Sequence, residues 1–330
     1  MEPYPRMRDR CDYDLLRKQF SKMFRNARPC VISVDLDGVL SAVLLAGLFD
    51  WEVVGFYTLD DLFLRREVLD PSETNPEAGL RKAELVFLDH DIYRPWIDSI
   101  GHHLLQWSPQ TPIPLHTGAL ASLNPNLLRG ITMKEFQRKY PFGTFHFLLA
   151  CTNAWGVLGG FEPDDIVTAL LLQIDSSFIN AMTYQENALD WLDWLGGSDE
   201  TSPLNPVCRR LSQFTPREIL EQFRRLAVQF EEFGIPPRSQ ASVKDPTDGA
   251  QMRRLCNLIE WFEKKTGWKS RFSNIEPCGL VRFAMKRDRI KPTKKNFEEV
   301  IGTEPFSYAI IGSGPEGLNY NHFRKPISLP

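Results

Sequence analysis

The chain has 330 residues, a formal net charge of −3 and a composition in which 42% of the residues are hydrophobic. This length allows two domains with substantial cores, and the lack of repeats and low-complexity tracts excludes solenoid and fibrous folds. The six cysteines form no C-x-x-C pair and the charged N-terminus has no apolar core, so we expect reduced thiols, no secretory signal and a cytoplasmic location. The apolar stretches are interrupted too soon to predict a membrane span.

The first buried strand is predicted at residues 31–34, after an amphipathic N-terminal helix within residues 1–29. A second helix is predicted to begin directly after Gly38, at Val39. Asp35 and Asp37 are two positions apart, so their side chains project the same way into the crevice where open α/β sheets bind ligands. Neighbouring carboxylates repel each other unless a proton or a cation lies between them, and oxygen ligands suit Mg²⁺ or Mn²⁺. A metal site is one interpretation, and a cap on the helix is the other.

Further acids and two histidines follow later apolar segments. A second apolar strand ends in Asp89 and Asp91, His102 and His103 open a third apolar run, and Asp175 follows an apolar helix. Because the carboxyl ends of parallel strands meet at one edge of a sheet, we expect these groups to converge. Asp175 alone would usually be a cap or a solvated turn. As a member of this set it is predicted to be a metal ligand.

Together these segments resemble the DHH phosphoesterase superfamily. Its members have a strand ending in D-x-D-G-x-x-S, a strand ending in Asp, a D-H-H segment and a later lone Asp. The resemblance covers residues 30–180 and includes SLNPNLL at 122–128 and the helix-like segment 140–155. We expect an α/β fold in which 30–180 form a doubly wound, mainly parallel sheet domain that binds metal. Residues 181–249 are predicted to be a helical connector, and residues 250–330 a smaller C-terminal α/β domain that binds substrate.

By position, the resemblance implies a set of side chains that hold one or two Mn²⁺ ions, with Mg²⁺ as the alternative metal: Asp35, Asp37, Asp89, His102 and Asp175. It also implies catalytic roles for Asp35 and for His103, since the second histidine of the motif faces the substrate phosphate in the family. The metal would lower the pKa of a bound water, which then attacks phosphorus in line.

The chain departs from the family pattern in the third motif and in the first strand. Gly101 stands where D-H-H has its Asp, and Ser33 and Val31 stand where relatives often carry an additional Asp or His. A catalytically degenerate protein that binds nucleic acid or a partner without cleaving it is therefore one alternative. Another is a haloacid-dehalogenase-like phosphatase, in which Asp35 of D-L-D-G-V-L would be the nucleophile. That family needs a Lys and a later acidic pair, and the pair that begins at Asp164 instead indicates a helix N-terminus.

The connector is predicted to be helical, with a linker at residues 235–249. Trp191 and Trp194 lie at helical spacing, which favours packing over base stacking.

The C-terminal part is basic although the whole chain is slightly acidic. Its cations concentrate in residues 281–295, where Arg287 and Arg289 are candidate substrate contacts. A solvated basic face and a surface that tracks a polyanion both fit this pattern. The glycine-rich segment that follows is a tight turn or a loop that receives a phosphate. Its loose likeness to the substrate loop of DHH relatives implies further substrate contacts: Gly312, Gly314, Asn319 and His322.

These observations together predict a metal-dependent phosphodiesterase. We expect its substrate to be a short oligonucleotide, single-stranded nucleic acid or a cyclic dinucleotide. No membrane partner is expected, and a homodimer is one oligomeric state that the sequence allows.

Overall fold

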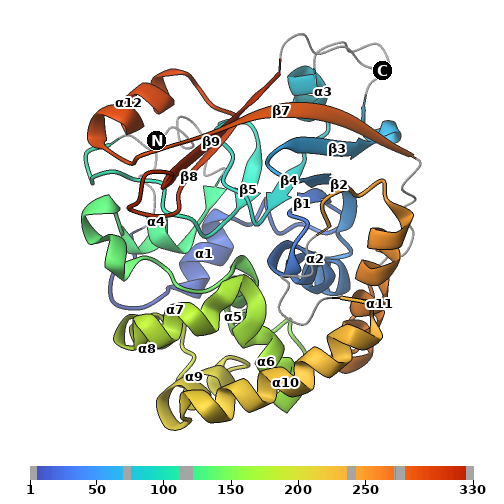
Figure 1. Cartoon of the computed structure of the whole chain (residues 1–330), viewed down its shortest axis with the longest axis vertical. Helices are drawn as coiled ribbons and strands as arrows, with labels where there is room; N and C mark the ends of the chain where they lie inside the picture. The colour runs from blue at the N-terminus through green and yellow to red at the C-terminus, as the bar shows by residue number, and fades with distance from the viewer. Residues whose placement is uncertain are drawn as a thin grey trace.

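A computed structural model describes residues 6–69, 76–111, 122–235, 243–270, 272 and 279–324. Within these residues one mixed sheet of nine strands runs through the molecule in the order β6-β5-β4-β1-β2-β3-β7-β9-β8 (Figure 1). The strands are β1 (Pro29–Ile32), β2 (Glu52–Tyr57), β3 (Asp61–Arg65), β4 (Val86–Leu88), β5 (Asp98–Ile100), β6 (Ser122–Leu123), β7 (Leu280–Ile290), β8 (Ser307–Ile310) and β9 (Leu318–Phe323).

The sheet has a parallel half and an antiparallel half. Strands β6, β5, β4, β1 and β2 are parallel, whereas β3, β7, β9 and β8 each pair antiparallel with their neighbours. The prediction of an α/β fold is confirmed. The expected C-terminal strands are present, but within the described residues they extend the same sheet instead of forming a separate one.

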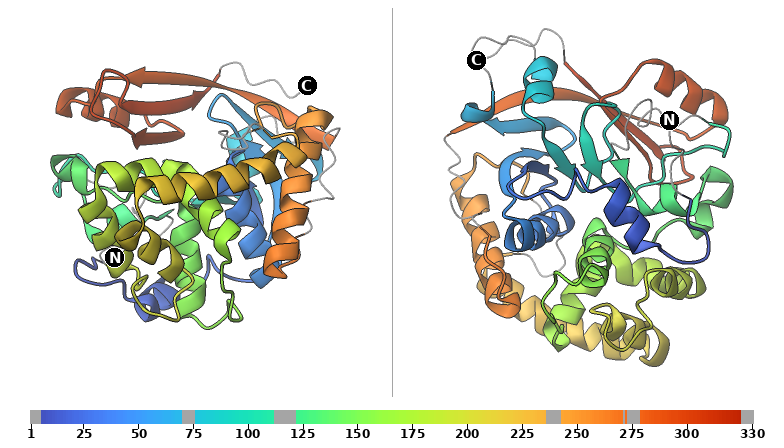
Figure 2. Two further views of the ribbon diagram at one scale, coloured as in Figure 1. Left: turned by 60° about the horizontal axis from the view of Figure 1, so that its bottom comes forward. Right: turned by 180° about the vertical axis from the view of Figure 1, so that it is seen from behind.

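The two halves share strand β7. Its first half, Leu280–Ala284, pairs with β3, and its second half, Met285–Ile290, pairs with β9. Figure 2 shows β7 passing from the blue strands to the red hairpin of β8 and β9. We call β7, β9 and β8 the C-terminal ribbon.

The first strand and the helix after it are formed by a nearly continuous apolar run. Strand β1 is buried except at Pro29, and α2 (Leu36–Phe49) is buried over its first ten residues because it packs between the sheet and a second helix, α5 (Thr144–Ala154). Asp35 caps α2 by accepting the N–H of Gly38 at 3.3 Å. The helix therefore begins at Leu36, three residues before its predicted start at Val39.

The remaining helices lie mostly on the same side of the sheet as α2 and α5 (Figures 1 and 2). They are α1 (Tyr13–Gln19), α3 (Pro76–Lys82), α4 (Pro125–Arg129), α6 (Asp165–Gln173), α7 (Ser177–Thr183), α8 (Gln185–Trp194), α9 (Asn205–Gln213), α10 (Pro216–Glu232), α11 (Gly249–Thr266) and α12 (Lys294–Gly302), with 3-10 turns at η1 (Arg66–Val68), η3 (Met133–Arg138) and η4 (Ile174–Ser176). Helices α12 and α3 are exceptions. Helix α12 lies beside the ribbon, and α3 packs on the opposite face of the sheet, where its Leu80 belongs to the same core cluster as Val31 and Phe87. The N-terminal helix was predicted within residues 1–29. Of the described part of this region, residues 6–29, helix covers only Tyr13–Gln19.

Several smaller predictions can be checked among these helices. Trp191 and Trp194 are buried in the core, which confirms their predicted packing role. Asp164 caps α6 by accepting the N–H of Val167 at 2.8 Å, which confirms the predicted helix N-terminus. Of the predicted linker at 235–249, residues 236–242 lie outside the described residues. The described cysteines are free thiols: Cys11, Cys30, Cys151, Cys208 and Cys256.

One helical run in the described residues, Asp165–Thr183, has the length and hydropathy of a membrane span. Half of it is buried inside the protein, and its backbone is broken at Asp175 and Ser176, which both have positive φ angles. Core helices of folded proteins have the same length and hydropathy, so this run is weak support for a membrane span.

Candidate metal centre

The candidate site lies beyond the carboxyl ends of the parallel strands. Strand β1 is flanked by β2 on one side and β4 on the other, so the chain leaves β1 in one direction and returns on its other side. Such a switch in strand order opens a crevice at the carboxyl ends of the two strands. The residues that follow β1 and β4 supply Asp35, Asp37 and Asp89, as the sequence indicated, and His102 and His103 follow β5, a strand that was not predicted.

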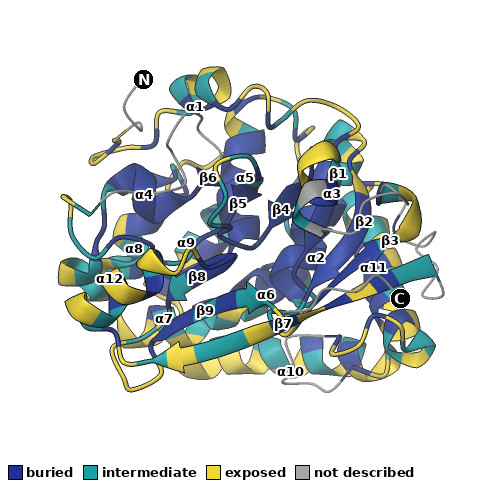
Figure 3. Ribbon diagram, turned by 90° about the horizontal axis from the view of Figure 1, so that it is seen from above, coloured by how far each residue is buried: buried dark blue, intermediate teal, exposed yellow. Residues whose placement is uncertain are grey.

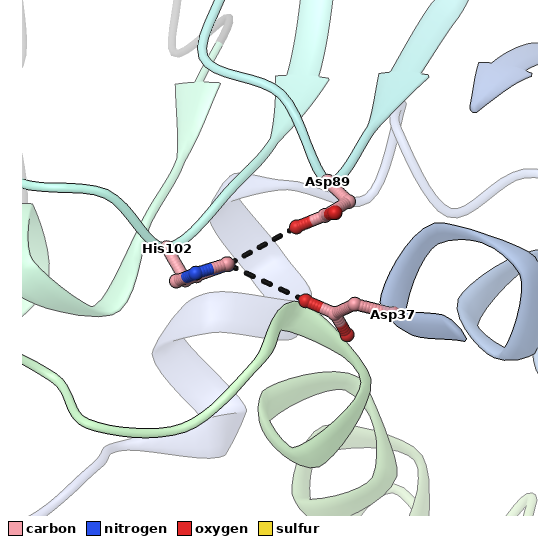
Figure 4. Close-up of side chains that lie close together, drawn as sticks. All are labelled: Asp37, Asp89 and His102. Carbon is pink, nitrogen blue, oxygen red and sulfur yellow. Dashed lines mark ion pairs between the residues drawn. The ribbon is translucent and has the colours of Figure 1, made fainter. Parts of the chain in front are cut away.

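Three of the predicted ligands meet at one point in this crevice (Figure 4). Asp37, Asp89 and His102 are buried, and one ligand atom from each lies within 4.8 Å of the others. His102 Nδ1 lies 3.1 Å from Asp89 Oδ1 and 3.4 Å from Asp37 Oδ2. Two carboxylates and an imidazole are a donor set that divalent Mn²⁺ accepts, so these side chains fit the predicted metal.

Asp37 is held by the N-terminus of α5. Its two carboxylate oxygens accept the backbone N–H groups of Thr144 at 2.6 Å and Phe145 at 2.7 Å. A Cβ atom on the preceding Gly143 would lie 2.6 Å from this carboxylate, so only glycine leaves room for it. Helix N-termini favour negative charge. Backbone N–H groups leave no signature of this role in the sequence, and Gly143 is its local signal.

Asp89 is fixed by two hydroxyl groups and by an unusual backbone conformation. Its φ angle is +60°, in a region that residues other than glycine seldom occupy. Thr144 Oγ1 donates to Asp89 Oδ1 at 3.0 Å, and Ser33 Oγ lies 2.7 Å from Asp89 Oδ2. Although burial alone would raise it, the hydrogen bond and charge of His102 hold the pKa of Asp89 well below its usual range.

Asp35 joins the site through Ser33. Ser33 Oγ lies 2.7 Å from Asp35 Oδ1 and 2.7 Å from Asp89 Oδ2, yet one hydroxyl donates only one proton. A further proton or a cation must therefore be shared among these carboxylates. Burial and the nearby charge of Asp89 raise the pKa of Asp35 to about 7.

Asp175 contacts the opposite side of His102. Its Oδ2 lies 3.0 Å from His102 Nε2, while the triad faces Nδ1. Asp175 and Ser176 both have positive φ angles, and strained backbone of this kind concentrates at functional sites. Although burial alone would lower it, the charge and hydrogen bond of Asp175, together with Asp89, raise the pKa of His102 well above its usual value. The structure thus places Asp175 beside the triad, where it orients the imidazole, and outside the triad itself.

The predicted asparagine–proline element holds the two histidines. Asn124 Nδ2 donates to the carbonyl of His103 at 2.9 Å, and Asn126 Nδ2 donates to the carbonyl of His102 at 2.7 Å. The two imidazole rings stack with centroids 4.3 Å apart, and His103 keeps a third of its side chain exposed toward the cleft. This arrangement leaves His103 free to contact a bound group.

The cleft above the triad has a volume of about 150 Å³ and two different walls. One wall carries the acids and histidines, and the other is formed by the C-terminal ribbon. Figure 3 shows that β8 and β9 are largely buried, whereas exposed and buried residues alternate along β7. The lining residues are Ser33, Asp35, Leu59, Asp89, His90, Asp91, His102, His103, Asp175, Ser307, Tyr308, Ala309, Ile311, Asn319 and Asn321.

The ribbon brings some of the predicted substrate contacts to this cleft. Arg287 pairs with Asn321 and Arg289 with Asn319, so these four side chains share one face of the ribbon. Arg287 Nε donates to Asn319 Oδ1 at 3.1 Å. Asn321, whose amide donates to the carbonyl of Leu59, also lines the cleft and was not predicted.

Other predicted contacts lie elsewhere. His322 is on the opposite face of the ribbon, where its ring nitrogen lies 3.2 Å from Thr303 Oγ1. Gly312 and Gly314 belong to the turn between β8 and β9 and are not among the residues that line the cleft. A Cβ atom on Gly317 would lie 2.0 Å from the carbonyl oxygen of Gly312, which explains the glycines as a tight turn.

Most cations of the basic segment have a carboxylate partner within 4 Å. The pairs are Arg282–Asp61, Lys286–Asp288, Arg287–Asp60, Arg289–Glu316, Lys294–Glu298 and Lys295–Glu299. Partial neutralisation of this kind weakens a surface as a track for a long polyanion.

No protein-family model, no curated protein and no solved structure matches this chain. The likeness to DHH phosphoesterases therefore rests on the motifs, and a functional conclusion depends on the geometry of the triad and its cleft.

Proposed function

We propose that this protein is a metal-dependent phosphodiesterase that hydrolyses short phosphodiester substrates, such as the end of an oligonucleotide or a cyclic dinucleotide. The observation that carries the proposal is the buried Asp37–Asp89–His102 triad, which opens onto a cleft whose opposite wall carries Asn319, and Arg287 donates a hydrogen bond to Asn319 from behind that wall. A metal on one wall and a guanidinium near the other suit a substrate with a phosphoryl group between them.

Each residue of the metal wall has a defined task in this proposal. When bound, Mn²⁺ or Mg²⁺ supplies the positive charge that polarises the phosphoryl group and activates a water. Asp37, Asp89 and His102 would hold it, and the N-terminus of α5 with Thr144 keeps the two carboxylates in place.

Two further side chains act on the substrate and on protons. His103 faces the cleft and would donate a hydrogen bond to a phosphoryl oxygen. Asp35 lines the cleft, and because its pKa lies near 7 it can hold and release a proton at neutral pH. Asp35 with Asp89 would also support a second ion if one binds.

The size of the cleft favours a short substrate. Pockets that enclose a whole small-molecule ligand span about 300–1,000 Å³, whereas this cleft has about 150 Å³. It therefore accommodates a phosphoryl group and leaves the attached nucleosides at its mouth. The paired cations of the basic segment give the same preference, since few unpaired charges remain to follow a long strand.

The division of labour along the chain is part of this proposal. Residues 30–180 bind the metal, residues 250–330 present the substrate-facing ribbon, and residues 181–249 connect them. The ribbon is fixed to the metal wall by backbone bridges between Ile92 and Ser307 and between Leu104 and Ile310. A cytoplasmic location and a homodimer stay predictions.

A screen of hydrolysis with added Mn²⁺ tests the proposal. Dinucleotides, longer single strands, cyclic dinucleotides and pyrophosphate are compared, and we expect turnover of the short phosphodiesters. Tight nucleotide binding with no turnover would support the degenerate alternative instead. Trapping of an aspartyl-phosphate on Asp35 would support the dehalogenase-like alternative.

A further inference from the structure

A side chain at position 101 would overlap with the carboxylate of Asp91. A Cβ atom on Gly101 would lie 2.5 Å from Asp91 Oδ2 and 2.6 Å from its Oδ1, closer than any real side chain allows. Gly101 is not among the glycines with a positive φ angle, so its backbone does not require glycine. The missing side chain at position 101 therefore makes room for the carboxylate of Asp91.

That carboxylate is buried and directed at His103. Asp91 Oδ2 accepts the backbone N–H of His103 at 3.2 Å and lies 3.7 Å from His103 Nδ1. Asp91 Oδ1 accepts Asn124 Nδ2 at 2.8 Å, and the same amide group donates to the carbonyl of His103. Asp91 and Asn124 thus bind both polar groups of the His103 backbone, and the Asp91 carboxylate lies within ion-pair distance of one edge of the ring.

We infer that Asp91 is a positioning residue for His103, supplying from the loop after β4 the carboxylate that position 101 lacks. It fixes the His103 ring against His102, so that the exposed edge of the ring faces the cleft. This inference rests on the proposed function only in assigning His103 to the substrate. It also removes the main reason to regard the G-H-H segment as a sign of a degenerate site.

The first test observes the His103 ring without turnover, by NMR of protein with ¹³C,¹⁵N-labelled histidine. We expect Asp91→Asn to shift the His103 ring signals, because a neutral amide then replaces the carboxylate that lies beside Nδ1 of the ring. The signals of His146 should stay in place, since its ring nitrogens contact Leu171 and Gly143 instead. His103 signals that do not move in Asp91→Asn would overturn the inference, whether or not the protein hydrolyses phosphodiesters.

The second test is a double-mutant cycle between Asp91→Asn and His103→Ala. Loss of an orienting partner commonly costs about tenfold or more, so Asp91→Asn alone should lower kcat by that factor with little change in KM. In the His103→Ala background it should have no further effect. Losses that multiply in the double mutant would show that Asp91 acts independently of His103 and would contradict the inference.

A third pair of variants tests the steric link. Gly101→Ala should lower kcat in the wild-type background, because it displaces the Asp91 carboxylate. In an Asp91→Gly background the same change should be neutral, since the space is then empty. An equal loss in both backgrounds would contradict the proposed exchange of side chains.

Discussion

The two walls of the cleft are built on different principles. On the metal wall, carboxylates are gathered at strand ends and held by backbone N–H groups and hydroxyls, as Asp37 is by the start of α5. On the ribbon wall, side chains alternate along antiparallel strands, and Arg287 is held by Asn319 and by the charge of Asp60. The side chains of the first wall are thus fixed by many hydrogen bonds, whereas those of the second wall depend on a few pairwise contacts. Substitutions in the metal wall should therefore change metal binding, whereas substitutions in the ribbon wall should change substrate binding and have smaller effects.

The largest effect is expected in the triad. Asp89→Ala or His102→Ala should abolish both Mn²⁺ retention and hydrolysis, because each removes one of three ligands from a minimal site. Elemental analysis of the purified variants measures the metal. Asp288→Ala, on the outer face of the ribbon, is the control and should retain it. Unchanged manganese in both triad variants would rule out the assignment.

The support of the metal wall is tested next. Gly143→Ala should weaken Mn²⁺ binding about tenfold or more, because its Cβ would displace the Asp37 carboxylate from α5. Calorimetric titration of the metal-free protein measures the affinity. Gly302→Ala is the matched control, since no atom lies within 4 Å of the added carbon. Equal affinities for the two variants would show that the contact with α5 does not position Asp37.

The pH dependence of stability also distinguishes the two walls. The ribbon residues that line the cleft include no carboxylic acid, whereas the metal wall contains Asp35. Burial, with the charge of Asp89, raises the pKa of Asp35 to about 7, against about 3.9 in an unfolded chain. Between these values the folded state binds a proton that the unfolded state has lost, so stability falls as pH rises through 7. The metal-free protein should therefore have a lower Tm at pH 8 than at pH 5.5. Added Mn²⁺ should raise Tm more at pH 8, where the carboxylate is ionised.

Asp35→Asn should flatten the pH dependence, and this variant is the control for other titrating groups. A Tm that rises between pH 5.5 and pH 8 in the metal-free wild type would contradict the assigned direction.

The smallest effect is expected on the ribbon. Arg287→Gln should raise KM for a dinucleotide severalfold while kcat changes little, because in the proposed function Arg287 and its partner Asn319 contact the substrate and hold no metal. Replacing Arg287, Arg289 and Lys291 together should change the salt slope of long single-strand binding by less than about one, since two of the three cations have carboxylate partners. A much flatter slope in the triple variant would favour a surface that follows a long strand.

The sequence was sufficient to locate the metal wall. The apolar runs before Asp37 and Asp89 marked parallel strands, and parallel strands bring the residues after them to one edge. Strand β5, which precedes His102, was not predicted, because the apolar run that the sequence shows there follows the histidines. It could not show that the segment starting at Gly143 would bind Asp37, because backbone N–H groups carry no sequence signature. Nor could it show that Asp91 fills the space at Gly101, which depends on how two loops meet.

The ribbon was harder to predict because strand register decides which side chains reach the cleft. Asn319 and Asn321 face the cleft, whereas His322, one position further along β9, faces away. Neighbouring residues of a strand point to opposite faces, so a one-residue difference reverses the assignment. The pairing of β7 with β3 was also hidden, because no local pattern announces a partner so distant in the chain.

That distant pairing has a consequence for biosynthesis. Asp61 of β3 lies opposite Ala284 of β7, about 220 positions later in the chain. During translation the metal wall can fold while the ribbon is still unmade, and domains generally fold in order of synthesis. Contacts of such long sequence separation are slow to form. If the proposed function holds, the metal wall of the nascent protein would fold before the cleft is complete, and activity would begin only after the C-terminal ribbon has been made.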